Sequence, residues 1–162
     1  MQKRWKPNVT VAAVIEQQGR FLLVEEQTSS GLRLNNPAGH LDPGEGLVQA
    51  CAREALEETA YQFHPSALVG VYLSRKQRAS DTGAADAVTY LRFAFCGELG
   101  AFDPTRRLDH GIVRTLWMTP EEITASATRH RSPALLQCMR DYLAGSRFSI
   151  DLLHTDLGTV AG

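Results

Sequence analysis

Apolar residues in the first part of the chain gather in two runs, which a polar segment follows. The runs lie at residues 9–16 and 20–26, are rich in β-branched side chains and surround a Gln-Gly pair. We therefore expect a hairpin of two buried strands. Residues 27–46 contain many Ser, Gly, Asn and Pro residues, a composition that predicts a loop with at most a short strand near Leu34.

The middle of the chain alternates between helical and extended patterns. Residues 47–59 are rich in Ala, Leu and Glu and predict a helix. Apolar runs at 68–75, 87–95 and 112–118 predict three more strands. The polar stretch 76–86 predicts a mobile loop between the first two of these.

Two helix starts follow in the last third of the chain. Thr119 is placed as an N-cap, Pro120 takes the first helical position and Glu122 completes a capping box. A Ser-Pro pair at 132–133 begins a second helix, and Gly145 ends it. The apolar stripe of this second helix is formed by Leu135, Leu136, Met139, Tyr142 and Leu143.

Strands interspersed with a few helices predict an α/β protein in which helices cover both sides of a mixed β-sheet. The 162 residues suit one domain without an obvious linker or internal repeat. We expect its core to run from about 6 to 153 and the C-terminal tail to be loose.

Composition and charge exclude several classes of protein. The formal net charge of -1 creates no strong field that would attract nucleic acid or an anionic membrane. No segment approaches the roughly 20 apolar residues of a membrane span, and the start shows no signal-peptide pattern. The three cysteines form no CxxC pair, so neither a disulfide framework nor a zinc site is expected. We expect a cytoplasmic protein with no nucleic-acid or membrane partner.

The predicted helix at 47–59 carries three carboxylates on one face. At about 100° per residue, Glu57 and Glu58 fall on the same face as Glu54, one turn further along. Taken alone, this pattern is typical of a solvated acidic surface. Like charges at this spacing destabilise a helix by roughly 0.2–0.5 kcal/mol per pair, which a divalent cation would relieve. The opposite face is formed by Val48, Ala52, Ala55, Leu56 and Thr59.

A set of residues at fixed spacing lies in and before this helix. The fixed positions are Gly39, Glu45, Arg53, Glu54, Glu57 and Glu58. They match the pattern G-x5-E-x7-R-E-U-x-E-E-x-G-U, where U is apolar, and the chain therefore resembles the Nudix hydrolases, a MutT-like family. The segments KPNVTVAAVI, PAGHLDPGE and YLRFAF and the last helix are similar to the NudJ-type phosphatases within it.

The resemblance implies a Nudix-type α/β/α sandwich and an enzyme that hydrolyses phosphoanhydrides. NudJ-type enzymes act on nucleoside di- and triphosphates, hydroxymethylpyrimidine diphosphate and thiamine diphosphate. Two departures are visible. Ala60 replaces the last glycine of the pattern, so we expect a right-handed helix exit or some strain. Leu34 stands where the subgroup often has Trp, which would weaken stacking on a substrate ring.

The resemblance also implies a metal site that holds Mg²⁺, or alternatively Mn²⁺. Glu57 and Glu58 would be ligands together with the backbone carbonyl of Gly39 or Ala38. Glu54 would bind the metal or activate the attacking water.

Other residues would support this centre. Arg53 would orient the acidic cluster, Glu45 would tie the preceding loop to Arg53, and Gly39 would permit close backbone approach. A further base or ligand often comes from a distant loop in this family. Asp109 is our candidate, and Glu98 is a weaker one.

Arg33, Asn36 and His40 lie beside the glycine of the pattern and are candidates for substrate binding, with ordinary loop hydrogen bonding as the alternative. The partner is expected to be a small-molecule diphosphate or nucleotide, bound by a monomer or small homo-oligomer. Two alternatives stay open. One is a Nudix pyrophosphatase for another substrate, such as ADP-ribose or a dinucleoside polyphosphate. The other is a non-catalytic nucleotide-sensing module, against which the intact acidic residues argue.

Overall fold

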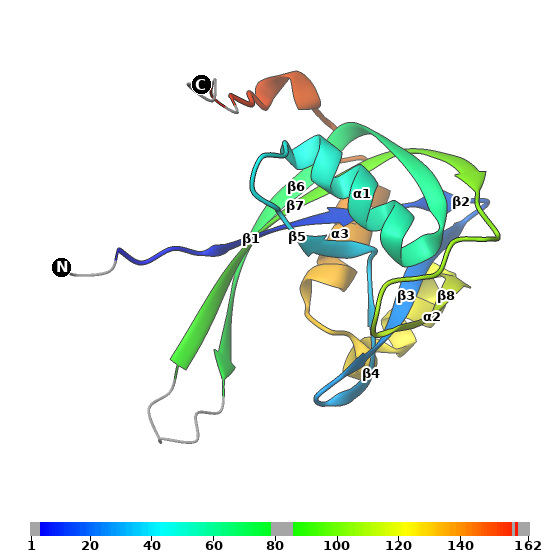
Figure 1. The fold of residues 1–162 in the computed structure, drawn as a ribbon. Helices are drawn as coiled ribbons and strands as arrows, with labels where there is room; N and C mark the ends of the chain where they lie inside the picture. The colour runs from blue at the N-terminus through cyan, green and yellow to red at the C-terminus, as the bar shows by residue number, and fades with distance from the viewer. Residues whose placement is uncertain (1–3, 79–85, 157, 159–162) are drawn as a thin grey trace.

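A computed structural model of the protein describes residues 4–78, 86–156 and 158 (Figure 1). The strands are β1 (Asn8–Ala13), β2 (Glu16–Gln17), β3 (Arg20–Thr28), β4 (Gly31–Asn35), β5 (Ala38–His40), β6 (Tyr61–Arg78), β7 (Asp86–Phe102), β8 (Ile112–Met118) and β9 (Phe148–Ser149). The helices are α1 (Leu47–Thr59), α2 (Pro120–Ala125) and α3 (Ala134–Leu143), with the 3-10 turns η1 (Ala127–Arg129) and η2 (Ile150–Leu152).

The strands form two sheets, of which the larger is mixed and the smaller is antiparallel. The larger sheet has the order β5-β1-β7-β6-β9. In it β1 and β7 are parallel, while the other neighbours are antiparallel. The smaller sheet has the order β2-β3-β4, and β8 also pairs with β3. The predicted mixed sheet is therefore confirmed.

Two apolar layers hold the helices on opposite sides of the sheets (Figure 1). Successive residues of β1 face opposite ways, as they must in a strand. Val11 and Ala13 pack in the layer that contains the apolar side of α1. Ala12 and Val14 pack in the layer that contains residues of α2 and α3. This arrangement confirms the expected α/β/α sandwich.

The helix α1 begins and ends where the sequence predicts, but β6 and β7 are longer than expected. They pair in one antiparallel ladder, interrupted by bulges, that continues through 76–78 on one strand and 86 on the other. The predicted mobile loop 76–86 is therefore wrong at both ends, because backbone pairing extends the strands through polar residues. Its middle, 79–85, lies outside the described residues.

The segment 27–46 was predicted to be a loop with at most a short strand near Leu34, and it holds one strand more than that: β4 confirms the strand at Leu34, and β5 was not predicted. It contains β4, which pairs with β3, and β5, which pairs with β1. The predicted strand at 9–16 is also interrupted, since β1 ends at Ala13 and β2 begins at Glu16. Strand β5 escaped the local pattern because its hydrogen-bonding partner, β1, is distant in the sequence.

The predicted helix ends agree with the structure. The Thr119 hydroxyl accepts a hydrogen bond from the Glu122 amide at 3.2 Å, and the Glu122 carboxylate accepts one from the Thr119 amide at 2.7 Å. Gly145, with φ +86°, follows α3. At the end of α1, Ala60 takes the left-handed conformation with φ 61°, so the expected right-handed exit is not used and the strain is present. In the part of the chain that is described, no helix is both long and apolar enough to cross a membrane.

Candidate active site

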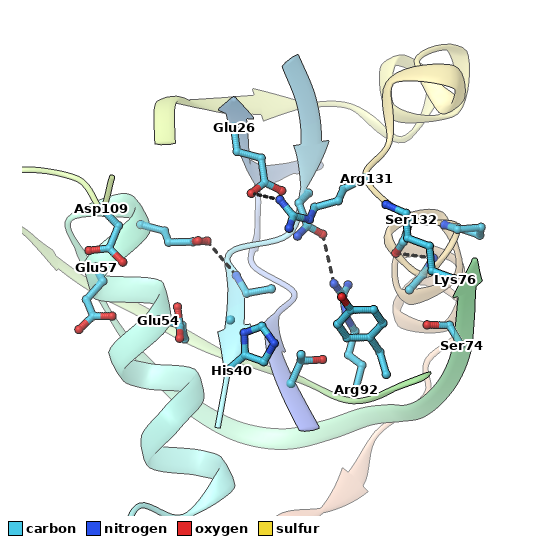
Figure 2. A pocket seen from close by; sticks show the side chains of 18 of the residues that line it. Glu26, His40, Glu54, Glu57, Ser74, Lys76, Arg92, Asp109, Arg131 and Ser132 are labelled. Atoms are coloured by element: carbon cyan, nitrogen blue, oxygen red, sulfur yellow. Dashed lines mark hydrogen bonds and ion pairs between the residues drawn. The ribbon is translucent and has the colours of Figure 1, made fainter. Parts of the chain in front are cut away.

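A cavity of about 730 Å³ lies beside the C-terminal half of α1 and extends to the start of α3. Figure 2 shows Glu54, Glu57 and Asp109 on one side of it and Arg92, Lys76 and Ser132 on the other. The carboxylates of its acidic end belong to Glu54, Glu57, Glu58 and Asp109, and Glu26 and Asp42 line other parts of the wall. The cationic side chains of the wall outside α1 are Arg75, Lys76, Arg92 and Arg131. The pocket thus presents separate surfaces for cations and for anions.

Arg53 joins the loop before α1 to the acidic end of the pocket. Its Nε and Nη2 donate to the two carboxylate oxygens of Glu45 at 3.0 and 2.6 Å. Its Nη1 donates to Glu54 at 2.9 Å and to Glu57 at 3.0 Å. Nη2 also donates to the carbonyl oxygen of His40 at 3.0 Å. These bonds fix the guanidinium and lower the pKa of the Glu45 carboxyl, chiefly through the bond from Arg53.

The carboxylates of Glu54 and Glu58 are nearly buried. Each residue is 8% exposed. Burial raises the pKa of Glu58 to about 8, although its carboxylate accepts a hydrogen bond from the Ala38 amide at 2.9 Å. Burial also raises the pKa of Glu54, against the opposing effect of Arg53. Two neighbouring acids whose charged forms are disfavoured are typical of a functional site that binds a cation or transfers a proton.

The position of these two residues corrects the expected division of α1 into a packed face and a solvated face. Glu54 and Glu58 lie on the buried side together with Cys51 and Ala55, while Glu57 remains partly exposed. The reason is the edge strand β5, which covers this part of the helix. Gly39 approaches so closely that a β-carbon there would lie 2.1 Å from Cδ of Glu54.

The distant loop candidate reaches the site. The amide of Asp109 donates to the carbonyl oxygen of Glu57 at 3.0 Å, and Asp109 lines the pocket. Glu98 does not reach it, since it is exposed on β7 in register with His64.

The three candidates for substrate binding are placed differently. His40 lines the pocket. The Arg33 guanidinium donates to the carbonyl of Leu32 and is not part of the pocket wall. Asn36, which follows β4, is only 2% exposed. Because it is buried, it also lies outside the pocket wall.

Comparison with known proteins identifies the family. The model of the NUDIX domain matches residues 4–137. The chain belongs to the Nudix family. It is 37% identical over 149 residues to phosphatase NudJ from Escherichia coli K12, with 92% of each chain covered, and equally similar to phosphatase NudJ from Shigella flexneri.

Solved structures agree with this assignment. A Nudix hydrolase from Nitrosomonas europaea is 48% identical, with a TM-score of 0.83 over 95% of this chain and 100% of that one. A MutT Nudix hydrolase from Burkholderia pseudomallei is 18% identical with a TM-score of 0.64, over 85% of this chain and 98% of that one, and so shares the fold. This Nudix protein is therefore a hydrolase that acts on phosphoanhydrides, and enzymes of the family generally use a divalent metal.

The acidic end of the pocket fits a divalent cation in its chemistry. Its donors are carboxylate oxygens and the nearby β5 backbone, which hard cations prefer. The burial that disfavours the charged forms of Glu54 and Glu58 would be offset by such an ion. Among the residues that the structure describes, no three acidic, His or Cys side chains are already grouped as a metal site. Arg53 donates to one carboxylate oxygen of Glu54 and one of Glu57, and the second oxygen of each is not bonded to Arg53.

Sequence reasoning missed several residues of the pocket. Glu26 and Arg131 lie side by side in its wall, with a hydrogen bond of 2.6 Å between them (Figure 2). Arg92 lies in the apolar YLRFAF run, where a charged residue inside a strand was a usable signal. Leu34, expected to affect ring stacking, is fully buried in the core and lies outside the pocket wall. The aromatic residues of the wall are His40 and Tyr90.

Proposed function

We propose that this Nudix hydrolase is a Mg²⁺-dependent phosphatase that releases orthophosphate from small organic diphosphates and from nucleoside di- and triphosphates. Hydroxymethylpyrimidine diphosphate and thiamine diphosphate are among the proposed substrates. One observation carries the proposal: a single cavity has clustered carboxylates at one end and cationic side chains at the other. Its volume, about 730 Å³, suits a molecule of nucleotide size.

A divalent cation, when bound, would neutralise the diphosphate oxygens and polarise the phosphorus. Glu57 and Glu58 would hold it, together with the backbone carbonyl of Gly39 or Ala38, and Glu54 would either be a further ligand or activate the attacking water. Mg²⁺ is the ion we propose, with Mn²⁺ as a substitute, since all these donors are oxygen atoms.

The proposed chemistry assigns proton transfer to the acidic end of the pocket. Glu54 would accept the proton of the attacking water, and its raised pKa favours this role because an effective base has a pKa close to the working pH. Arg53 would hold Glu54 and Glu57 in position. Asp109 would assist as a second base or ligand, since its backbone is tied to Glu57.

The organic part of the substrate would lie toward the cationic end. The name of the NudJ relatives, phosphatase, supports attack at the terminal phosphorus. We further propose that the chain acts as one domain, as a monomer or small homo-oligomer, in the cytoplasm. Its three buried free thiols support a reducing compartment.

A phosphate-release assay tests the proposal. The purified protein is incubated with GDP, thiamine diphosphate, hydroxymethylpyrimidine diphosphate and ADP-ribose, with Mg²⁺ or with EDTA. We expect Mg²⁺-dependent release from the terminal diphosphates. Hydrolysis in ¹⁸O-water should put the label in orthophosphate. Label only in the organic monophosphate, turnover of ADP-ribose alone, or binding without turnover would each contradict the proposal.

A further inference from the structure

Arg92 lies in the middle of the larger sheet and lines the pocket. On β7 it is in register with Thr10 of β1 and Tyr72 of β6. Figure 2 shows its side chain across the pocket from Glu54. Its Nη2 donates to the amide oxygen of Asn35 at 3.3 Å, a long hydrogen bond to a neutral group. Its Nη1 is buried and has no hydrogen-bond partner among the described residues.

This environment is unfavourable for a guanidinium. A charged group removed from water is normally paired with an opposite charge, as the partly buried Arg53 is with Glu45. In the described part of the chain no carboxylate forms an ion pair with Arg92. The Cys138 thiol lies close enough to interact, but its own burial raises its pKa, so it stays neutral. The missing acceptor is therefore best supplied by a ligand in the pocket.

Aromatic residues next to Arg92 indicate what kind of ligand. Tyr90 precedes Arg92 by two residues on β7, so both side chains project from the same face of the strand and both line the pocket. The rings of Tyr90 and His40 are 6.4 Å apart between centroids and inclined at 52°. A flat ring that stacks against Tyr90 would bring its edge to the arginine beside it.

We propose that Arg92 is a specificity-determining residue whose guanidinium donates a hydrogen bond to an acceptor on the heterocycle of the substrate, whose ring lies against Tyr90. This inference rests on the proposed function, because it assigns the cationic end of the pocket to the organic group. A guanidinium donates hydrogen bonds and accepts none. It therefore favours a ring edge with an oxo group, as in guanine, over one with an amino group, as in adenine.

GDP and ADP test this directly because they share the ribose and the diphosphate. We expect the wild-type enzyme to prefer GDP in kcat/KM. Arg92→Met keeps an unbranched apolar stem but removes every donor. It should lower kcat/KM for GDP by about 10- to 100-fold, the range for a hydrogen bond to a charged group, and for ADP by less than about threefold. Arg92→Lys should retain part of the preference. Arg140→Gln, an exposed arginine of α3, is the control and should change neither value.

A stability measurement separates ligand recognition from a structural role. Since Arg92 lacks a carboxylate partner, its replacement by Met should leave the thermal midpoint unchanged or higher. A clear fall in the midpoint would overturn the inference. So would an equal loss of kcat/KM for GDP and ADP, which would indicate a phosphate contact.

Binding of the products distinguishes failure of this inference from failure of the proposed function. Calorimetry with GMP and AMP measures ring recognition without turnover. Tighter binding of GMP that is lost in Arg92→Met supports the inference even if no diphosphate is hydrolysed. Hydrolysis of GDP and ADP at equal rates, with equal binding of GMP and AMP, overturns the inference and leaves the proposed function standing.

Discussion

Gly39 lies against the carboxylate of Glu54, so closely that a β-carbon at position 39 would be 2.1 Å from Cδ of Glu54. The close approach brings the backbone of β5 beside the acidic face of α1. Here the glycine is required for space, since its φ is not in the left-handed region. A methyl group at this point would push the Glu54 side chain, and not the backbone, out of position.

Gly39→Ala should therefore impair catalysis more than folding. We expect kcat to fall by about 100-fold, the loss typical of a misplacement of about 1 Å at a reacting group. The thermal midpoint should change little, because the end of a flexible side chain can move aside. Activity and thermal unfolding are measured on the same preparation.

Gly19→Ala provides a control with the opposite pattern. Gly19 has φ +77° in the turn between β2 and β3, with nothing within 4 Å of an added β-carbon. Alanine there should reduce stability by about 1 kcal/mol because of the left-handed backbone, and leave kcat unchanged. Equal effects of the two substitutions on activity would contradict the role given to Gly39.

The carboxylates proposed as metal ligands can be neutralised one at a time. Glu57→Gln and Glu58→Gln should each lower kcat by more than about 100-fold, since each removes a charged oxygen ligand and a part of the general-base environment. Glu121→Gln on α2 is the exposed control and should have no effect. Near-normal activity in both variants, with their circular dichroism unchanged, would exclude α1 as the site.

The raised pKa of Glu58 predicts how stability depends on pH in metal-free buffer. Burial raises the pKa of Glu58 to about 8 in the folded protein, above the 4.5 of an ordinary glutamate side chain, so folding favours the protonated form. This contribution is complete below about pH 4.5 and is lost as the pH rises through about 8. The thermal midpoint of the wild type should therefore fall relative to that of Glu58→Gln between pH 5 and pH 9.

Addition of Mg²⁺ provides the second half of this experiment. At pH 9 the ion should raise the midpoint of the wild type more than that of Glu58→Gln, because an ion that binds only the folded state stabilises it. Parallel pH profiles for the two proteins in EDTA would show that Glu58 titrates normally.

Asp109 is positioned by its own backbone, which donates to the carbonyl of Glu57. If the Asp109 carboxylate supplies a base or a ligand, Asp109→Asn should lower kcat by at least about tenfold. This is a conservative expectation, since a general acid or base typically contributes about 10²- to 10⁴-fold to the rate. The backbone bond does not involve the side chain, so the loop should keep its place. An unchanged kcat would transfer the role to Glu54 or to water alone, since Glu98 lies outside the pocket wall.

Local interactions explain what the sequence by itself determined. The limits of α1, the capping box at Thr119 and the end of α3 at Gly145 depend on residues within one or two turns of each other. The spacing of the acidic residues is likewise a property of one helix and the loop before it. These features, and the family to which the chain belongs, can be predicted from the sequence alone.

Only the tertiary structure decided which side chains share the pocket and which are buried. Strand β5 forms because the distant strand β1 offers it backbone partners, and β5 covers Glu54 and Glu58 on a face that looked solvated. Arg92 and Arg131 come from segments far apart in the chain. The periodicity of apolar residues along the chain does not predict such contacts, because they depend on how the sheets and helices pack against one another.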